Sequence, residues 1–112
     1  MPHILRAADR PPSRNRTVRF EGAGHDTGIS FFAVDNDPGQ GPVLHTHPYA
    51  ETWMVQSGKA QMRAGDAVID AGPGDIVVVE PNVPHAFTNV GTGRLVIFCI
   101  HDSPAMIQTD LE

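Results

Sequence analysis

Four residues of the sequence have the types and the spacing of a metal site. His45 and His47 stand two positions apart, so on an extended strand both imidazoles point to the same side. Glu51 follows after a proline that turns the chain, and His85 lies one predicted pair of strands later. Three imidazoles and one carboxylate suit a divalent transition ion (Mn, Fe, Co, Ni, Cu or Zn), whereas Ca²⁺ and Mg²⁺ prefer oxygen ligands. The same side chains can instead form a hydrogen-bonded network without metal, and their spacing alone leaves both interpretations open.

A second group of residues is predicted to surround these four. Alternation along the strand that begins near Glu51 places Trp53 and Val55 on the same face as the carboxylate. We therefore expect a pocket lined by Trp53, Val55, Phe87 and Asn89, although packing in the core equally explains the apolar ones and closing a turn explains the asparagine. His101, directly after an apolar segment, is a candidate catalytic residue or a surface residue.

The elements that must position these residues are short strands. Gly and Pro make up 21 of the 112 residues and divide the chain at regular intervals. Between them lie segments with strand character: 18–20, 29–34, 52–56, 61–63, 67–69, 76–79, 85–88 and 95–100. Short strands joined by turn residues are typical of a sandwich or a barrel, so we predict an all-β chain with little or no helix. The tail after Pro104 is predicted to form at most one helical turn.

Two of these segments, 76–79 and 95–100, are apolar at every position. Such a strand has both faces covered. In a short chain a second subunit would supply the cover, so we expect a homodimer; the N-terminal segment is the alternative. Cys99, the single cysteine, lies in the second segment and has no disulfide partner in the chain, so we expect it to be an inert core residue.

Length and composition indicate one domain over residues 1–112. The hydrophobic fraction of 40% is ordinary, and no apolar run approaches the roughly 18–20 residues that span a bilayer. The first residues lack the apolar stretch and the cleavage site of a signal peptide. We therefore expect no membrane partner and a cytoplasmic location.

Charge is distributed unevenly along the chain. The net charge is −5, yet residues 1–19 hold five of the eight basic residues and a single acidic one. A basic arm can bind nucleic acid, but this one has no aromatic residue to stack on bases, and the acidic remainder repels phosphate. We expect the arm to be solvated or to pack on the acidic body of a second subunit, without nucleic acid.

The sequence around the four candidate ligands resembles the cupin superfamily. Residues 39–58 contain the anchors of the first cupin motif: a glycine, five residues, His-x-His, three residues, Glu, six residues and a glycine. Residues 74–89 resemble the second motif through Gly74, His85 and Asn89. Two positions depart from it, because Pro81 stands one residue late and Val83 occupies a place where glycine is common. The motifs cover residues 39–89, nearly half of the chain.

The resemblance implies a jelly-roll β-barrel that holds one divalent transition-metal ion through His45, His47, Glu51 and His85, and it favours a homodimer. If the ion has six coordination positions, four protein ligands leave two for a small molecule or for a small molecule and dioxygen. The first hypothesis is thus a metal-dependent enzyme (oxygenase, isomerase or lyase) that acts on a small organic substrate. The second is a binding or sensing module without turnover, because no dedicated general base is evident.

Overall fold

The computed structural model describes residues 2–10, 13 and 15–112, so Arg14 of the basic arm lies outside the described residues. Short strands carry nearly all of the regular structure. In chain order, the elements are a 3₁₀ turn, η1 Ala7–Asp9, and the strands β1 Val18–Glu21, β2 Ser30–Asn36, β3 His45–Thr46, β4 Glu51–Ser57, β5 Ala60–Ala64, β6 Ala67–Ala71, β7 Ile76–Val79, β8 His85–Asn89, β9 Leu95–His101 and β10 Thr109–Asp110.

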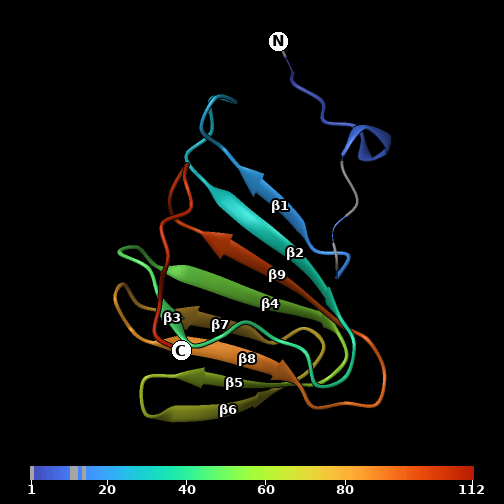
Figure 1. Cartoon of the computed structure of the whole chain (residues 1–112), viewed down its shortest axis with the longest axis vertical. Helices are drawn as coiled ribbons and strands as arrows, with labels where there is room; N and C mark the ends of the chain where they lie inside the picture. Colours follow the sequence, from blue (N-terminus) through green and yellow to red (C-terminus); the bar gives the residue numbers. More distant parts are fainter. Residues whose placement is uncertain (1, 11–12, 14) are drawn as a thin grey trace.

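The strands form two five-stranded antiparallel sheets that face each other (Figure 1). The first sheet has the order β1-β2-β9-β4-β7, and the second has the order β10-β3-β8-β5-β6. Consecutive strands β3 and β4 lie in different sheets, and β8 and β9 do so as well, so the chain crosses between the layers as in a jelly roll. The prediction of an all-β jelly-roll barrel is confirmed.

All eight strand segments predicted from the sequence are strands in the structure, with boundaries that differ by at most two residues. The prediction for the C-terminal tail was wrong, because residues 109–110 form β10 instead of a helical turn. This short strand pairs with β3, and the Leu111 N–H donates to the Leu44 carbonyl at 2.8 Å. A partner more than sixty residues away decides the conformation, and local sequence does not reveal such a partner.

The core lies between the two sheets and consists of alternate residues from their inner faces. Trp53, Val55, Met62, Leu95 and Ile97 are fully buried there. Cys99 is buried in the same cluster as a free thiol, and burial raises its pKa well above the usual value. The thiol is therefore protonated and unreactive at neutral pH, as expected for a core residue.

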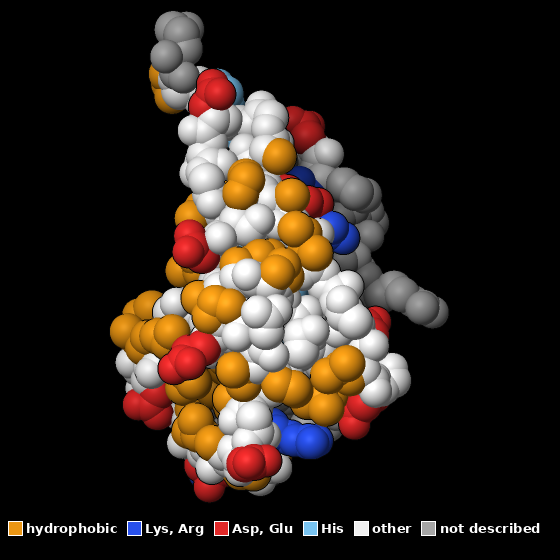
Figure 2. Space-filling model, turned by 90° about the vertical axis from the view of Figure 1, so that its left-hand side faces the viewer, with side chains coloured by type: hydrophobic (Ala, Val, Ile, Leu, Met, Phe, Trp, Pro, Cys, Tyr) orange, Lys and Arg blue, Asp and Glu red, His pale blue; other side chains and the backbone are white. Residues whose placement is uncertain are grey.

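The two segments that are apolar throughout have one face in this core and one face outward. On the outward face, Ile76 and Val78 of β7 are 61% and 63% exposed, and Phe98 and Ile100 of β9 are 39% and 38% exposed. Figure 2 shows another side of the molecule, where groups of hydrophobic side chains stand among scattered acidic ones. The covering of the outward face by a second copy or by the arm stays a prediction.

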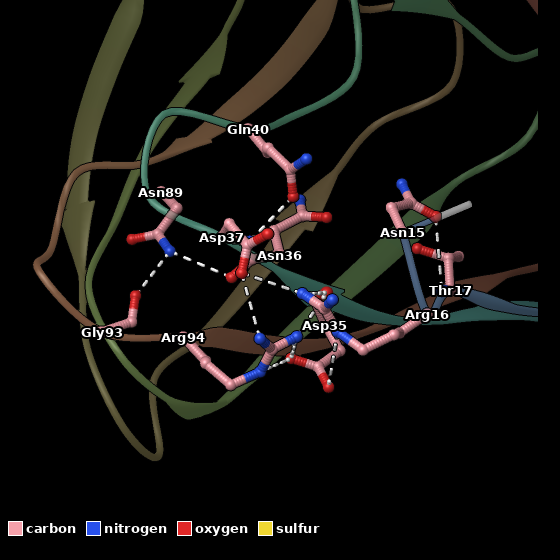
Figure 3. A network of polar contacts seen from close by, with 10 residues as sticks. All are labelled: Asn15, Arg16, Thr17, Asp35, Asn36, Asp37, Gln40, Asn89, Gly93 and Arg94. Carbon is pink, nitrogen blue, oxygen red and sulfur yellow. Dashed lines mark hydrogen bonds and ion pairs between the residues drawn. The ribbon is translucent and has the colours of Figure 1, made fainter. Parts of the chain in front are cut away.

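The part of the basic arm that adjoins β1 is tied to the barrel by ion pairs. Arg16 and Arg94 both contact the carboxylate of Asp37, at 2.9 and 3.0 Å, and Arg94 also contacts Asp35 at 2.6 Å (Figure 3). Two guanidinium groups thus bridge the start of β1, the end of β2 and the turn before β9.

Within the described part of the chain, no helix is long and apolar enough to cross a membrane.

Candidate metal centre

The two sheets bring the four candidate ligands together at one end of the barrel. His45 begins β3 and His85 begins β8, and the two are direct partners in the second sheet, with ring centroids 4.2 Å apart. Glu51 begins β4 in the opposite sheet, and His47 lies in the loop between β3 and β4. One ligand atom from each residue lies within 4.8 Å of the others, and all four side chains are buried.

Backbone carbonyls orient the three imidazoles in the same way. Nδ1 of His45 donates to the Val43 carbonyl at 2.6 Å, and Nδ1 of His85 donates to the Val83 carbonyl at 2.8 Å. Nδ1 of His47 donates to the carbonyl of Ile107 at 2.7 Å. When such a ring is neutral and keeps its proton on Nδ1, its Nε2 is unprotonated, so each of the three Nε2 atoms can offer a lone pair to a metal ion.

The Glu51 carboxylate completes the cluster. Its Oε1 lies 3.1 Å from Nε2 of His47 and 3.2 Å from Nε2 of His85, and its Oε2 accepts a hydrogen bond from the indole N–H of Trp53. Burial acts to raise the pKa of Glu51, but the contacts with His47 and His85 outweigh it and hold the pKa well below its usual range. The carboxylate is therefore ionised, as a metal ligand must be.

The polar atoms of the cluster do not all satisfy one another, and a divalent ion would complete their bonding. Nε2 of His47 is buried and makes no well-aligned hydrogen bond, although Oε1 of Glu51 lies 3.1 Å away. An unpaired buried nitrogen costs free energy, whereas a metal ion at the centre of three Nε2 atoms and one carboxylate would use every donor atom. Three nitrogens and one oxygen are the donor set of a divalent transition ion, so the residues fit such an ion.

A fourth histidine lies beside the cluster. His101 ends β9 and turns its Nε2 toward Oε1 of Glu51, 3.4 Å away. The Tyr49 hydroxyl accepts the Ile107 N–H at 3.1 Å and donates to Nδ1 of His101 at 2.7 Å, which leaves the His101 proton on Nε2. Burial, partly opposed by Glu51, lowers the pKa of His101 to about 4, so the ring is neutral at pH 7.

A cavity of about 400 Å³ opens beside these residues. Its walls come from β2, the loop after β2, β3, β8, β9 and the C-terminal tail, and its lining residues include His45, Glu51 and His101. A metal ion bound by the cluster would therefore face the cavity. This volume suits a small organic molecule.

The structure changes the predicted pocket lining. Phe87 lines the cavity, but Trp53, Val55 and Asn89 are not among its lining residues. Alternation correctly placed Trp53 and Val55 on the face of Glu51, yet the cavity lies on the β2 side of the barrel and these two side chains fill the core. The Asn89 amide instead donates to the carbonyls of Asn36 and Gly93, at 3.1 and 2.8 Å, and so joins the end of β2 to the loop before β9 (Figure 3).

Several residues of the site were not predicted from the sequence. Tyr49 was not singled out, although it follows His47 by two positions and stacks on that ring with centroids 5.0 Å apart. The missed cavity walls lie mainly in β2 and the following loop: Phe32, Val34, Asn36, Gln40 and Pro42. The alternation of Phe32, Val34 and Asn36 within one strand was the available signal.

Comparison with known proteins agrees with the fold and with this site. The model of the cupin domain family matches residues 32–101, which is more than half of the chain. The chain therefore belongs to the cupin family. A comparison with curated proteins gives no match.

Solved structures with the same fold include enzymes of oxalate metabolism. A variant of oxalate decarboxylase from Bacillus subtilis is 23% identical, with a TM-score of 0.83 over 96% of this chain and 31% of that one. The formate complex of Lactobacillus farciminis oxalate decarboxylase is 21% identical, with a TM-score of 0.76 over 85% and 30%. An oxalate oxidase in complex with glycolate is 21% identical, with a TM-score of 0.75 over 88% and 57%. The chain thus spans less than two thirds of each of these proteins.

Proposed function

We propose that this cupin is a metal-dependent enzyme that acts on a small organic substrate bound in the cavity. One divalent transition-metal ion would be held by His45, His47, Glu51 and His85. The observation that carries the proposal is that His45 and Glu51 belong both to the ligand cluster and to the cavity wall. A purely structural metal is normally enclosed by its ligands, whereas this cluster borders a space that a substrate can enter.

A bound ion would supply Lewis acidity and, if it is redox-active, the activation of dioxygen. The chain's own residues add a positioned proton. His101 lines the cavity and holds a proton on Nε2, while the Tyr49 hydroxyl fixes the ring through Nδ1. A substrate oxygen beside the metal site would lie near this N–H, so His101 would bind and orient it. Phe32 and Phe87 add apolar surface to the cavity wall.

The donor set supports oxygenase, isomerase and lyase chemistry alike, because each needs a metal with open coordination positions. Several structural neighbours are enzymes of oxalate, a small dicarboxylate. Among the described residues that line the cavity here, none is Lys or Arg. A doubly charged acid would therefore have no cationic side chain to neutralise its second charge, and this argues for a less charged substrate.

The alternative is a binding or sensing protein that uses the same metal and cavity without turnover. This alternative is favoured because, apart from the metal ligands and the protonated thiol of Cys99, His101 is the one titratable group among the described residues that line the cavity. Both proposals predict ligand binding at the metal, and turnover separates them.

The test begins with protein purified without chelator and with a His47→Ala control. We expect about one equivalent of a transition metal per chain in the wild type and its loss in the control, measured by elemental analysis. A panel of small hydroxy, keto and carboxylic compounds is then followed with and without dioxygen by mass spectrometry and an oxygen electrode. Metal-dependent consumption of a compound supports the enzyme. Binding without consumption supports the sensing alternative, and a metal-free wild type contradicts both.

A further inference from the structure

The cavity has a polar end that the metal chemistry does not use. Asn36, the last residue of β2, lines the cavity and is only 3% exposed. Its side-chain Oδ1 is buried and has no hydrogen-bond partner. A buried amide without partners is unfavourable, and in folded proteins such a group is normally paired with protein, water or a ligand.

The surroundings of Asn36 fix its backbone and leave its amide free. Its carbonyl accepts from Nδ2 of Asn89 at 3.1 Å, and the next N–H, that of Asp37, donates to Oε1 of Gln40 at 2.8 Å. The Asp37 carboxylate is in turn held by Arg16 and Arg94 (Figure 3). The end of β2 is therefore rigid, and the unpaired side chain at the cavity wall is a preformed hydrogen-bonding group.

This amide lies far from the ligand cluster along the barrel. Ser30 on β2 pairs with His101 on β9, which pairs with Glu51 on β4, so Ser30 lies at the level of the ligand cluster. Asn36 follows Ser30 by six residues on the same strand and marks a second level. At a rise of about 3.3 Å per residue, β2 covers roughly 20 Å between these two levels. In the facing sheet, β8 covers roughly 13 Å between His85 and Asn89, whose amide donates to the Asn36 carbonyl.

The lining residues that β2, β8 and β9 supply between the two levels are apolar, namely Phe32, Val34, Phe87 and Cys99. The segment before β1, the loop after β2 and the C-terminal tail add polar residues to the wall, namely Asn15, Thr17, Gln40 and Gln108.

Charge sets a further condition on the occupant. Among the described lining residues, Glu51 is the one acidic residue and none is Lys or Arg. A divalent ion bound beside one carboxylate carries a net charge of about +1, so the metal end accepts one negative charge and the far end accepts none.

From these observations we infer that the ligand is an elongated molecule with three parts: a metal-binding oxygen group with at most one negative charge, an apolar body, and an uncharged hydrogen-bonding group that pairs with Asn36. The inference rests on the proposed function, since the head group binds the metal. It adds the class of substrate, because Asn36 then selects ligands that carry a polar group at the end away from the metal.

Matched probes test this selection. Each probe carries a hydroxamate head, an alkyl chain from a graded series of lengths, and a terminal group that is either a carboxamide or an isopropyl group of the same shape. Binding to Co²⁺-loaded protein is measured by isothermal titration calorimetry, and the Co²⁺ absorption spectrum reports whether the head reaches the metal. The proteins are wild type, Asn36→Leu, His47→Ala, and Gln61→Leu as a control that replaces an exposed amide on β5.

In the wild type and in Gln61→Leu, the carboxamide probe of the best length is expected to bind about tenfold more tightly than its isopropyl match. Asn36→Leu should abolish or invert this preference while the Co²⁺ spectrum still responds to the head. Equal binding of the matched probes to the wild type overturns the inference and leaves the proposed function standing, even if Asn36→Leu does not fold. If no hydroxamate perturbs the spectrum of the loaded wild type, the proposed function fails, and the inference fails with it.

Discussion

Glu51 and His101 are direct partners across β4 and β9, and Oε1 of the carboxylate lies 3.4 Å from Nε2 of the imidazole. Both side chains are buried at the end of the barrel. The pairing places an ionised ligand and a neutral imidazole at the same cavity wall. It also links the candidate metal centre to Tyr49, whose hydroxyl donates to the other nitrogen of His101.

The first prediction concerns the acid stability of the metal-free protein. The folded-state pKa of His101 is about 4, below its value of about 6.5 in an unfolded chain. Between these values the unfolded chain binds a proton that the folded chain does not, so the free energy of unfolding falls as pH falls from about 6.5 to about 4. The lowered pKa of His45 also makes the free energy of unfolding fall as the pH falls. The raised pKa of His85 has the opposite effect, because above pH 6.5 the folded chain holds a proton that the unfolded chain has lost.

This dependence is measured as the melting temperature of chelator-treated protein at pH 7 and at pH 4.5. His101→Gln keeps an acceptor for Tyr49 but cannot titrate in this range, so it should show a smaller drop in melting temperature than the wild type. The same drop in both proteins would contradict the assignment of the effect to His101.

The second prediction tests the carboxylate ligand. Glu51→Gln removes the one negative charge of the cluster but nearly keeps the side-chain volume. Loss of an outer-shell partner already costs roughly 10- to 100-fold in metal affinity, so loss of a direct ligand should cost at least this much. Glu80→Gln, at an exposed position after β7, is the matched control and should bind metal like the wild type. The measurement is metal content at graded free-metal concentrations set by a chelator buffer.

The strands of the barrel could be predicted from the sequence because alternation and turn residues are local. The segments that form β2, β4, β8 and β9 each show apolar residues bounded by Gly, Pro or polar residues. The two-residue strands β3 and β10 carry no such pattern, because each is defined by its long-range partner. The tail was therefore predicted as a helical turn and forms a strand instead.

The candidate ligands were predictable because a compact motif contains three of them, and His85 follows at a family spacing. The cavity was not. Which side of the barrel is left open depends on how β1, β2 and the tail pack, so Trp53 and Val55 were expected to line it and fill the core instead. The neighbourhood of His101 depends on the register between β4 and β9, which local sequence does not specify.

The third prediction concerns the loop that closes the cavity after β2. A Cβ at Gly41 would overlap the carbonyl oxygen of Phe87, and the adjacent loop is held to β8 by the Asn89 N–H, which donates to the Gln40 carbonyl at 2.9 Å. Gly41→Ala must therefore shift this loop, and we expect a loss of about 1–3 kcal/mol of the free energy of unfolding. Gly72→Ala is the control, since a Cβ there meets nothing within 4 Å, and should change stability by at most about 0.5 kcal/mol. Denaturant titration of both variants checks the difference; equal stability would show that the loop adapts without cost.

The last prediction concerns the outward face of the first sheet. Two cross-strand rows run over it, Phe20-Phe31-Ile100-Thr52-Val78 and Val18-Ala33-Phe98-Met54-Ile76, and neither contains a charged residue. The corresponding rows of the second sheet include Arg63 and Asp70. Two chains of net charge −5 repel each other, so a second copy would pack best over these two uncharged rows, away from Asp35 at the end of the same face.

We therefore expect the chain to be a dimer in which the first sheets of two copies pack together. Analytical ultracentrifugation should give a dimer for the wild type and a monomer for Val78→Lys, because the new charge would be buried against its symmetry mate. Val68→Lys is the matched control, since Val68 is 65% exposed on the outer side of the second sheet, and this variant should remain a dimer. Metal content should be equal in all three proteins, which separates loss of assembly from loss of fold. A monomeric wild type would contradict the prediction, and a dimer that survives Val78→Lys but not Val68→Lys would place the interface on the second sheet.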